Sequence, residues 1–225
     1  MKIVVSMLVA GLARLICGTA PRWIGCEPSN QQRIYFANHT SHLDFLVLWG
    51  SLPADVRART RPVAGRDYWD RNPIRRYLAR QVFNAVLVDR RDSRSAVTRH
   101  AQITAARRNV ERTATALGTD TSLIIFPEGT RGDGLEVAPF KSGLYHLCRL
   151  RPDVELVPVH LENLHRILPK GALLPVPLAG SVTFGQPMRL DPGEDKNAFL
   201  ARARGALMMV SRPCPGPSTV ISRAS

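Results

Sequence analysis

The chain reads Ala37-Asn38-His39-Thr40-Ser41-His42-Leu43-Asp44 between two apolar runs, at residues 34–36 and 45–49. The first run combines a β-branched residue with two aromatic residues, which is typical of a buried strand. Ser41 lies just ahead of the second run, where the N-cap residue of a helix is expected. The pattern therefore predicts a strand, a polar turn and a helix, with His39 in the turn and Asp44 about one helical turn inside the helix.

This spacing can bring a base and its orienting group together. The Asp44 carboxylate can accept a hydrogen bond from one imidazole nitrogen of His39, which leaves the other nitrogen basic and facing outward. A base held in this way can deprotonate a substrate hydroxyl directly, so no serine or cysteine nucleophile is required. The alternative interpretation is that both residues merely cap a helix.

A second polar stretch, Phe126-Pro127-Glu128-Gly129-Thr130-Arg131, follows the apolar run at residues 123–125. A strand that ends there delivers a carboxylate, a flexible glycine, a hydroxyl and a guanidinium to one edge of a sheet. Arginine and glycine together suit an oxyanion such as phosphate, because the guanidinium can make two parallel hydrogen bonds and glycine lets the backbone approach closely. By itself, the stretch could also be an ordinary loop with an ion pair.

Taken together, the two stretches resemble the lysophosphatidic acid acyltransferase family of glycerolipid acyltransferases, whose first motif is NHxSxxD, with its HX4D core, and whose third is FPEGTR. Two further stretches match the second and fourth motifs in the same order, Val86-Leu87-Val88-Asp89-Arg90 and Val157-Pro158-Val159. Gly132 is a departure, since many relatives carry serine at that position.

The resemblance implies transfer of a fatty acyl group to the free hydroxyl of 1-acyl-glycerol 3-phosphate in phospholipid biosynthesis. It implies His39 as the general base, Asp44 as its orienting group, and backbone N–H groups near Gly129 as candidate donors to the oxyanion. The residues expected to bind or position the acceptor are Arg90, Glu128, Gly129, Thr130 and Arg131.

The same resemblance sets the expected co-substrates. Acyl-CoA or acyl-carrier protein serves as the acyl donor, and neither a metal nor another cofactor is expected. A lysophospholipid is the expected acceptor. Glycerol 3-phosphate or another lyso-lipid, such as lyso-ornithine lipid, remains an alternative acceptor, and a catalytically silent membrane-attached relative remains an alternative to the enzyme.

The composition indicates an anionic partner. The 225 residues carry a formal net charge of +13, which suits nucleic acid, an anionic bilayer, or a phosphorylated or CoA-borne substrate. No nucleic-acid-binding motif is recognisable and the positive charge is spread along the chain, so nucleic acid is not expected. The four cysteines form no CxxC pair and show no zinc-ligand spacing, so we expect free thiols.

An apolar stretch occupies residues 2–17. It is too short to span a bilayer and is interrupted by Arg14, and Pro21 is a poor residue to follow a signal-peptide cleavage site. We expect a helix that lies in an anionic membrane interface on the cytoplasmic face, as a peripheral or monotopic attachment, with Lys2 and Arg14 reaching for head groups. The alternative is a helix packed on the core of the domain.

Strands that alternate with helices predict a single α/β domain with a mixed, mostly parallel sheet flanked by helices. We expect a membrane-associating helix at residues 1–25, an acyltransferase domain at 26–212 and a disordered tail at 213–225. One helix is expected across residues 68–82, where aromatic residues and arginines are typical either of a contact with anionic lipid or of any exposed arginine-rich helix.

Overall fold

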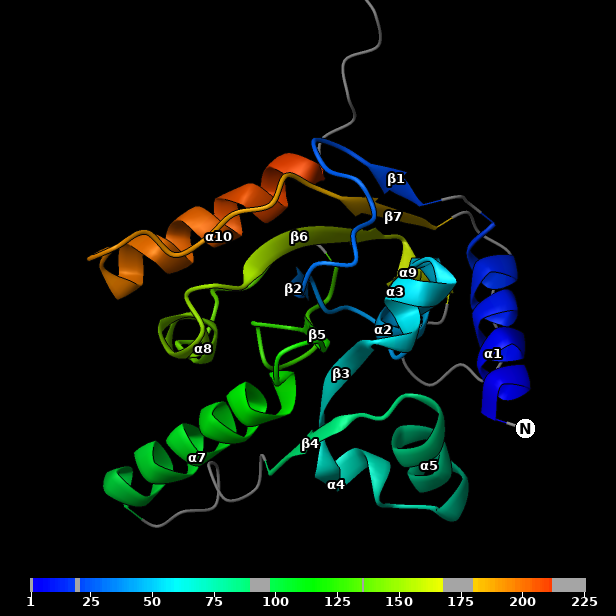
Figure 1. Ribbon diagram of the computed structural model, residues 1–225, viewed down its shortest axis with the longest axis horizontal. Helices are drawn as coiled ribbons and strands as arrows, with labels where there is room; N and C mark the ends of the chain where they lie inside the picture. Colours follow the sequence, from blue (N-terminus) through cyan, green and yellow to red (C-terminus); the bar gives the residue numbers. More distant parts are fainter. Residues whose placement is uncertain (1, 19–20, 90–97, 135, 168–179, 212–225) are drawn as a thin grey trace, which may run out of the picture.

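The computed structural model describes residues 2–18, 21–89, 98–134, 136–167 and 180–211. A sheet of seven strands runs through the middle in the order β1-β7-β6-β2-β5-β3-β4 (Figure 1). The strands are β1 (Arg22–Trp23), β2 (Arg33–Ala37), β3 (Thr60–Gly65), β4 (Val86–Val88), β5 (Ser122–Ile125), β6 (Glu155–Glu162) and β7 (Ser181–Phe184). Neighbouring strands pair in parallel except β6 and β7, which are antiparallel. The predicted α/β fold with a mixed, mostly parallel sheet is confirmed.

Helices cover both faces of this sheet (Figure 1). On one side lie α7 (Arg99–Leu117), α8 (Gly143–Leu150) and α10 (Lys196–Val210). The other side carries α1 (Lys2–Cys17), α2 (Asp44–Ser51), α3 (Ala54–Ala58) and α9 (Leu164–Ile167). Between β3 and β4 the chain forms α4 (Arg66–Trp69), α5 (Pro73–Tyr77) and the π-helix η1 (Leu78–Val82).

Strand β2 is buried along its whole length, and after Arg33 its residues are apolar or aromatic. Ile34 and Phe36 pack into the core beneath α8 and α10, whereas Tyr35 and Ala37 pack into the core beneath α1 and α2. Alternate side chains of a strand point to opposite faces, and all four of these are completely buried. The central strand thereby holds the polar stretch that follows it in a fixed place.

Two local predictions were wrong. The helix expected across residues 68–82 is interrupted, because the Asn72 side chain accepts a hydrogen bond from the N–H of Arg75 and Pro73 begins α5; an asparagine cap followed by proline starts a new helix. Ser41 is not the N-cap of α2, which begins at Asp44. Its hydroxyl accepts a hydrogen bond from the N–H of Leu43 instead (3.3 Å).

Helix α1 packs on α2 through small residues. A Cβ added to Gly50 would lie 3.1 Å from the Cβ of Ala13, so the two helices cross closely. Arg14 donates hydrogen bonds to the carbonyls of Gly50 (2.7 Å) and Leu52 (3.3 Å) at the end of α2, where helix carbonyls lack partners. The expectation that Arg14 reaches for head groups was therefore wrong. Within the described ranges, no helix is long and apolar enough to cross a bilayer.

The structure leaves some expectations open. It describes helix α7 from Arg99 onward, with Thr98 as its N-cap. Arg90 and residues 213–225 lie outside the described residues. Strand β1 pairs with β7, so residues 22–23 join the sheet, and the proposed division at residue 25 stays a prediction.

Candidate active site

The two polar stretches leave the sheet at the same edge. β2 and β5 pair in parallel, with Phe36 opposite Ile125, and parallel strands present their carboxyl ends together, where open α/β sheets bind ligands. A cavity of about 510 Å³ lies at this edge. Its lining includes the polar residues His39, His42, Asp67, Arg71, Thr130 and Arg131.

Asp44 holds the imidazole of His39. Its Oδ2 atom lies 2.8 Å from His39 Nδ1 and also accepts hydrogen bonds from the N–H groups of Thr40 (2.5 Å) and Ser41 (2.8 Å). Because this buried carboxylate oxygen acts as an acceptor, Nδ1 is the donor of the pair, and in the neutral ring the lone pair is then on Nε2. The ring stacks on Phe126, with 4.3 Å between centroids. The pairing expected from the sequence spacing is present.

Glu128 joins the two polar stretches through their backbones. Its Oε1 atom accepts a hydrogen bond from the N–H of His39 (2.7 Å), and Oε2 accepts one from the N–H of Ala138 (2.9 Å). The N–H of Gly132 in turn donates to the His39 carbonyl (2.8 Å). Glu128 is 3% exposed. These contacts favour a role in positioning His39 over direct contact with the acceptor.

Asn38 ties the same turn to a third strand. Its side-chain Nδ2 donates to the carbonyl of Leu161 and its Oδ1 accepts from the N–H of Leu161, both at 2.8 Å. The amide therefore imitates a neighbouring strand, because it satisfies both backbone groups of one residue on β6. The sequence did not indicate this role for Asn38, because it does not show that β6 lies next to β2.

Gly129 makes the tight turn below the cavity. Its φ of +70° lies in the left-handed region, and a Cβ there would lie 2.9 Å from Cδ and Nζ of Lys141. The N–H of Lys141 donates to the carbonyl of Pro127 (2.9 Å), which holds the Lys141 backbone beside the glycine, while its side chain is exposed. The positive φ favours glycine at this position, and a Cβ would also displace the end of the Lys141 side chain.

Gly129→Ala is expected to lower the free energy of unfolding by about 2 kcal/mol, because alanine strains the positive φ and crowds Lys141. Urea denaturation measures the change. Gly193→Ala is the matched control, since Gly193 has a φ of +77° and nothing lies within 4 Å of its added Cβ. Equal losses in both variants would show that the contact with Lys141 contributes nothing.

Two guanidinium groups line the cavity. Arg131 follows β5, as expected, and Arg71 comes from the turn between α4 and α5. No motif or spacing in the sequence pointed to Arg71 as a binding residue. Two arginines are well suited to one dianion. The predicted partnership of Arg131 with Arg90 remains a prediction, because Arg90 lies outside the described residues.

His42 and Tyr68 form an aromatic edge to the cavity. Their rings stack with centroids 5.1 Å apart, and the guanidinium of Arg75 lies 4.5 Å from the Tyr68 centroid. Burial lowers the pKa of His42, and the charges of Arg131, His39 and Arg75 lower it further, whereas Asp44 raises it. His42 is therefore neutral at neutral pH. In the sequence, two adjacent aromatic residues, Tyr68 and Trp69, were the sign that could have indicated this edge of the cavity.

This geometry defines a class of site: an oriented histidine base at the carboxyl edge of an α/β sheet, facing a cavity lined with arginines. Such a site suits proton abstraction from a hydroxyl of an anionic substrate. The chain belongs to the Acyltransferase family, whose model matches residues 24–162. The resemblance to glycerolipid acyltransferases is confirmed.

Named relatives agree with this assignment. The chain is 29% identical over 178 residues to the 1-acyl-sn-glycerol-3-phosphate acyltransferase of Cocos nucifera, a match that covers 76% of this chain and 51% of that protein. It is 29% identical over 137 residues to the Homo sapiens 1-acyl-sn-glycerol-3-phosphate acyltransferase alpha, covering 60% of this chain and 42% of that protein. The chain thus spans about half the length of these relatives.

A solved structure shares the fold. The 1-acyl-sn-glycerophosphate (LPA) acyltransferase PlsC from Thermotoga maritima superimposes with a TM-score of 0.64 at 19% identity, over 94% of this chain and 81% of that one. At this identity the likeness shows a common fold.

Proposed function

We propose that the protein transfers a fatty acyl group from a thioester to the free hydroxyl of 1-acyl-glycerol 3-phosphate, in phospholipid biosynthesis. The observation that carries the proposal is the 2.8 Å contact between His39 Nδ1 and Asp44 at a cavity that also contains Arg71 and Arg131. The relatives are named as 1-acyl-sn-glycerol-3-phosphate acyltransferases, which supports this choice of acceptor. The donor is acyl-CoA or acyl-carrier protein.

His39 acts as the general base in this reaction. Its Nε2 atom accepts the proton of the acceptor hydroxyl while the oxygen attacks the thioester carbonyl carbon. A carbon–oxygen bond forms, the carbon–sulfur bond breaks, and the departing thiolate takes the proton back from the imidazolium. Asp44 stabilises the imidazolium through its bond to Nδ1. No step needs a cofactor.

The oxyanion of the tetrahedral intermediate needs hydrogen-bond donors. The N–H of Gly129 already donates to the carbonyl of Phe126 (3.0 Å), so that group is not available. No backbone hydrogen bond within the described residues uses the N–H of Thr130 or Arg131. These two groups at the cavity are the donors in our proposal.

The acceptor phosphate binds to the arginines of the cavity. Arg131 and Arg71 supply two guanidinium groups, and Arg90 is the third ligand expected from the sequence. Glu128 contributes by holding the His39 backbone. A lipid whose head group lacks phosphate would gain little binding energy from these arginines.

Helix α1 attaches the protein to an anionic membrane, on the cytoplasmic face. One face of the helix packs on α2, as the alternative interpretation of the sequence required. The opposite face exposes large apolar side chains, each more than half exposed: Val4, Met7, Leu8, Leu12 and Leu15. A helix with such a face suits the membrane interface.

Release of free thiol from palmitoyl-CoA tests the function, with purified protein in detergent micelles. Release is expected only when lysophosphatidic acid is present. A parallel reaction with acyl-carrier protein identifies the donor. Release that requires glycerol 3-phosphate or lyso-ornithine lipid instead would show that the acceptor is wrong, and no release with any donor and acceptor would favour a silent relative.

A further inference from the structure

A strongly basic segment borders the cavity. Residues 66–82, here called the basic arm, contain α4, α5 and η1. They include five arginines and two aspartates, a formal charge of +3. The arm also exposes two large apolar side chains, Ile74 (70%) and Tyr77 (38%). Exposed apolar residues among arginines are typical of segments that lie in a membrane interface.

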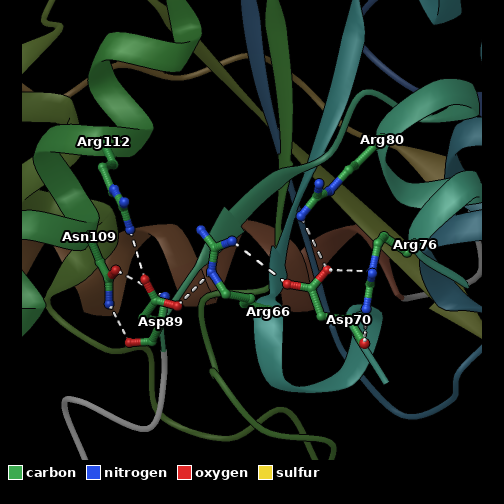
Figure 2. A network of polar contacts seen from close by, with 7 residues as sticks. All are labelled: Arg66, Asp70, Arg76, Arg80, Asp89, Asn109 and Arg112. Atoms are coloured by element: carbon green, nitrogen blue, oxygen red, sulfur yellow. Dashed lines mark hydrogen bonds and ion pairs between the residues drawn. The ribbon is translucent and has the colours of Figure 1, made fainter. Parts of the chain in front are cut away.

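The arginines of the arm are held in place without being neutralised (Figure 2). Arg76 and Arg80 lie 3.5 and 3.4 Å from one carboxylate oxygen of Asp70, and Arg66 lies 3.7 Å from the other. Three arginines therefore share the Asp70 carboxylate, and only Arg66 has a second acidic partner, Asp89, among the ion pairs of the described residues. Arg76 and Arg80 are each half exposed, so the excess positive charge is available at the surface.

Asp89, directly after β4, anchors the cluster to the domain (Figure 2). Its carboxylate accepts hydrogen bonds from Arg66 (2.7 Å) and from Arg112 of α7 (2.8 Å), and the Asn109 side chain bonds both its N–H and its carbonyl. Partial burial acts to raise the pKa of Asp89, but the hydrogen bonds from Arg112 and Arg66 hold it below its usual value. The arm is thus fixed relative to the sheet.

The arm lies between the helix proposed to touch the membrane and the cavity. η1 contacts α1, and α1 and α5 lie on the same side of the molecule (Figure 1). Four residues of the arm line the cavity: Asp67, Tyr68, Trp69 and Arg71. A surface that contacted both α1 and the arm would therefore lie at the mouth of the cavity.

We propose that the basic arm binds an anionic membrane surface. Its arginines contact lipid phosphates, and Ile74 and Tyr77 enter the head-group region, so that a lyso-lipid passes directly from the bilayer into the cavity. Only the passage of a lyso-lipid into the cavity rests on the proposed function. A soluble anion, such as the nucleotide part of CoA, would use the arginines but not the two exposed apolar side chains, which favours the bilayer.

The charge of the arm is tested by sedimentation of the full chain with vesicles of phosphatidylcholine, alone or mixed with phosphatidylglycerol. The double variant Arg76→Gln/Arg80→Gln is expected to lower partitioning onto the mixed vesicles about 30-fold, because each arginine near an anionic surface contributes about fivefold. Binding to phosphatidylcholine alone should change little. An equal loss in the control Arg107→Gln/Arg108→Gln, on α7, would overturn the proposal.

The apolar contact is tested by Ile74→Glu. Ile103→Glu is the matched control, because Ile103 is also exposed (59%) but lies on α7. Ile74→Glu is expected to weaken binding to both kinds of vesicle and to slow transfer to a vesicle-borne acceptor. Transfer to a short-chain acceptor dissolved as monomers should be unchanged, as should the melting temperature.

Two other outcomes separate the hypotheses. If the variants of the arm raise KM for palmitoyl-CoA with the dissolved acceptor, the arm binds the donor and the membrane proposal is wrong. If the arm directs vesicle binding but the wild type transfers acyl groups to no acceptor, the proposed function fails while the membrane contact is supported.

Discussion

His39→Ala is expected to lower kcat for acyl transfer by about 10²–10⁴-fold, the usual contribution of a positioned general base. The Nε2 atom acts only as the acceptor hydroxyl loses its proton, so KM for the acceptor should change much less than kcat. Thiol release from palmitoyl-CoA with lysophosphatidic acid measures both constants. The domain should remain folded, because the His39 ring contributes one stacking contact and one hydrogen bond to Asp44.

His146→Ala is the control for this variant. His146 is an exposed histidine on α8, on the opposite side of the sheet from α2, and its removal should leave kcat unchanged. Thermal unfolding of both variants separates loss of catalysis from loss of fold. Substantial transferase activity in His39→Ala would show that another group removes the hydroxyl proton.

The contact between His39 and Asp44 was predictable because its geometry is local. His39 and Asp44 are five residues apart, and a turn between a strand and a helix brings two such side chains within hydrogen-bond distance. The buried strand β2 was equally predictable, because a short apolar run of this composition is typical of one. Both predictions rest on the periodicity of the chain and require no knowledge of which strands are neighbours.

Contacts between distant segments were not predictable in the same way. Arg14 looked like a head-group ligand because it interrupts an apolar helix, yet its partners are carbonyls 36 and 38 residues away. Asp89 likewise pairs with Arg66 and Arg112, each 23 residues away in the sequence. A sequence shows which groups need partners but not which partners the fold supplies.

The break in the helix expected across residues 68–82 differs from these cases, because its signal is local. Asn72 followed by Pro73 is both a cap and a helix-starting pair, and the residue before a proline is biased away from helical backbone angles. The regular spacing of aromatic and aliphatic residues on either side obscured it. The break matters because the turn it creates carries Arg71 into the cavity lining.

Glu128→Ala is expected to lower both stability and kcat. The substitution leaves the N–H groups of His39 and Ala138 without their carboxylate acceptor, and each unsatisfied buried donor costs about 1–3 kcal/mol. Release of the His39 backbone would also displace the imidazole, and a misplacement of about 1 Å can lower the rate about 10²-fold. Urea denaturation and steady-state kinetics measure the two effects.

The kinetic pattern then distinguishes positioning from substrate binding. If Glu128 only holds His39, kcat falls while KM for lysophosphatidic acid stays nearly constant, and Glu128→Gln recovers part of the stability because its amide oxygen can still accept one of the two hydrogen bonds. Glu155→Ala is the control, since its carboxylate pairs with Arg33 at the opposite end of β6. A raised KM with unchanged kcat and stability would place Glu128 in contact with the acceptor.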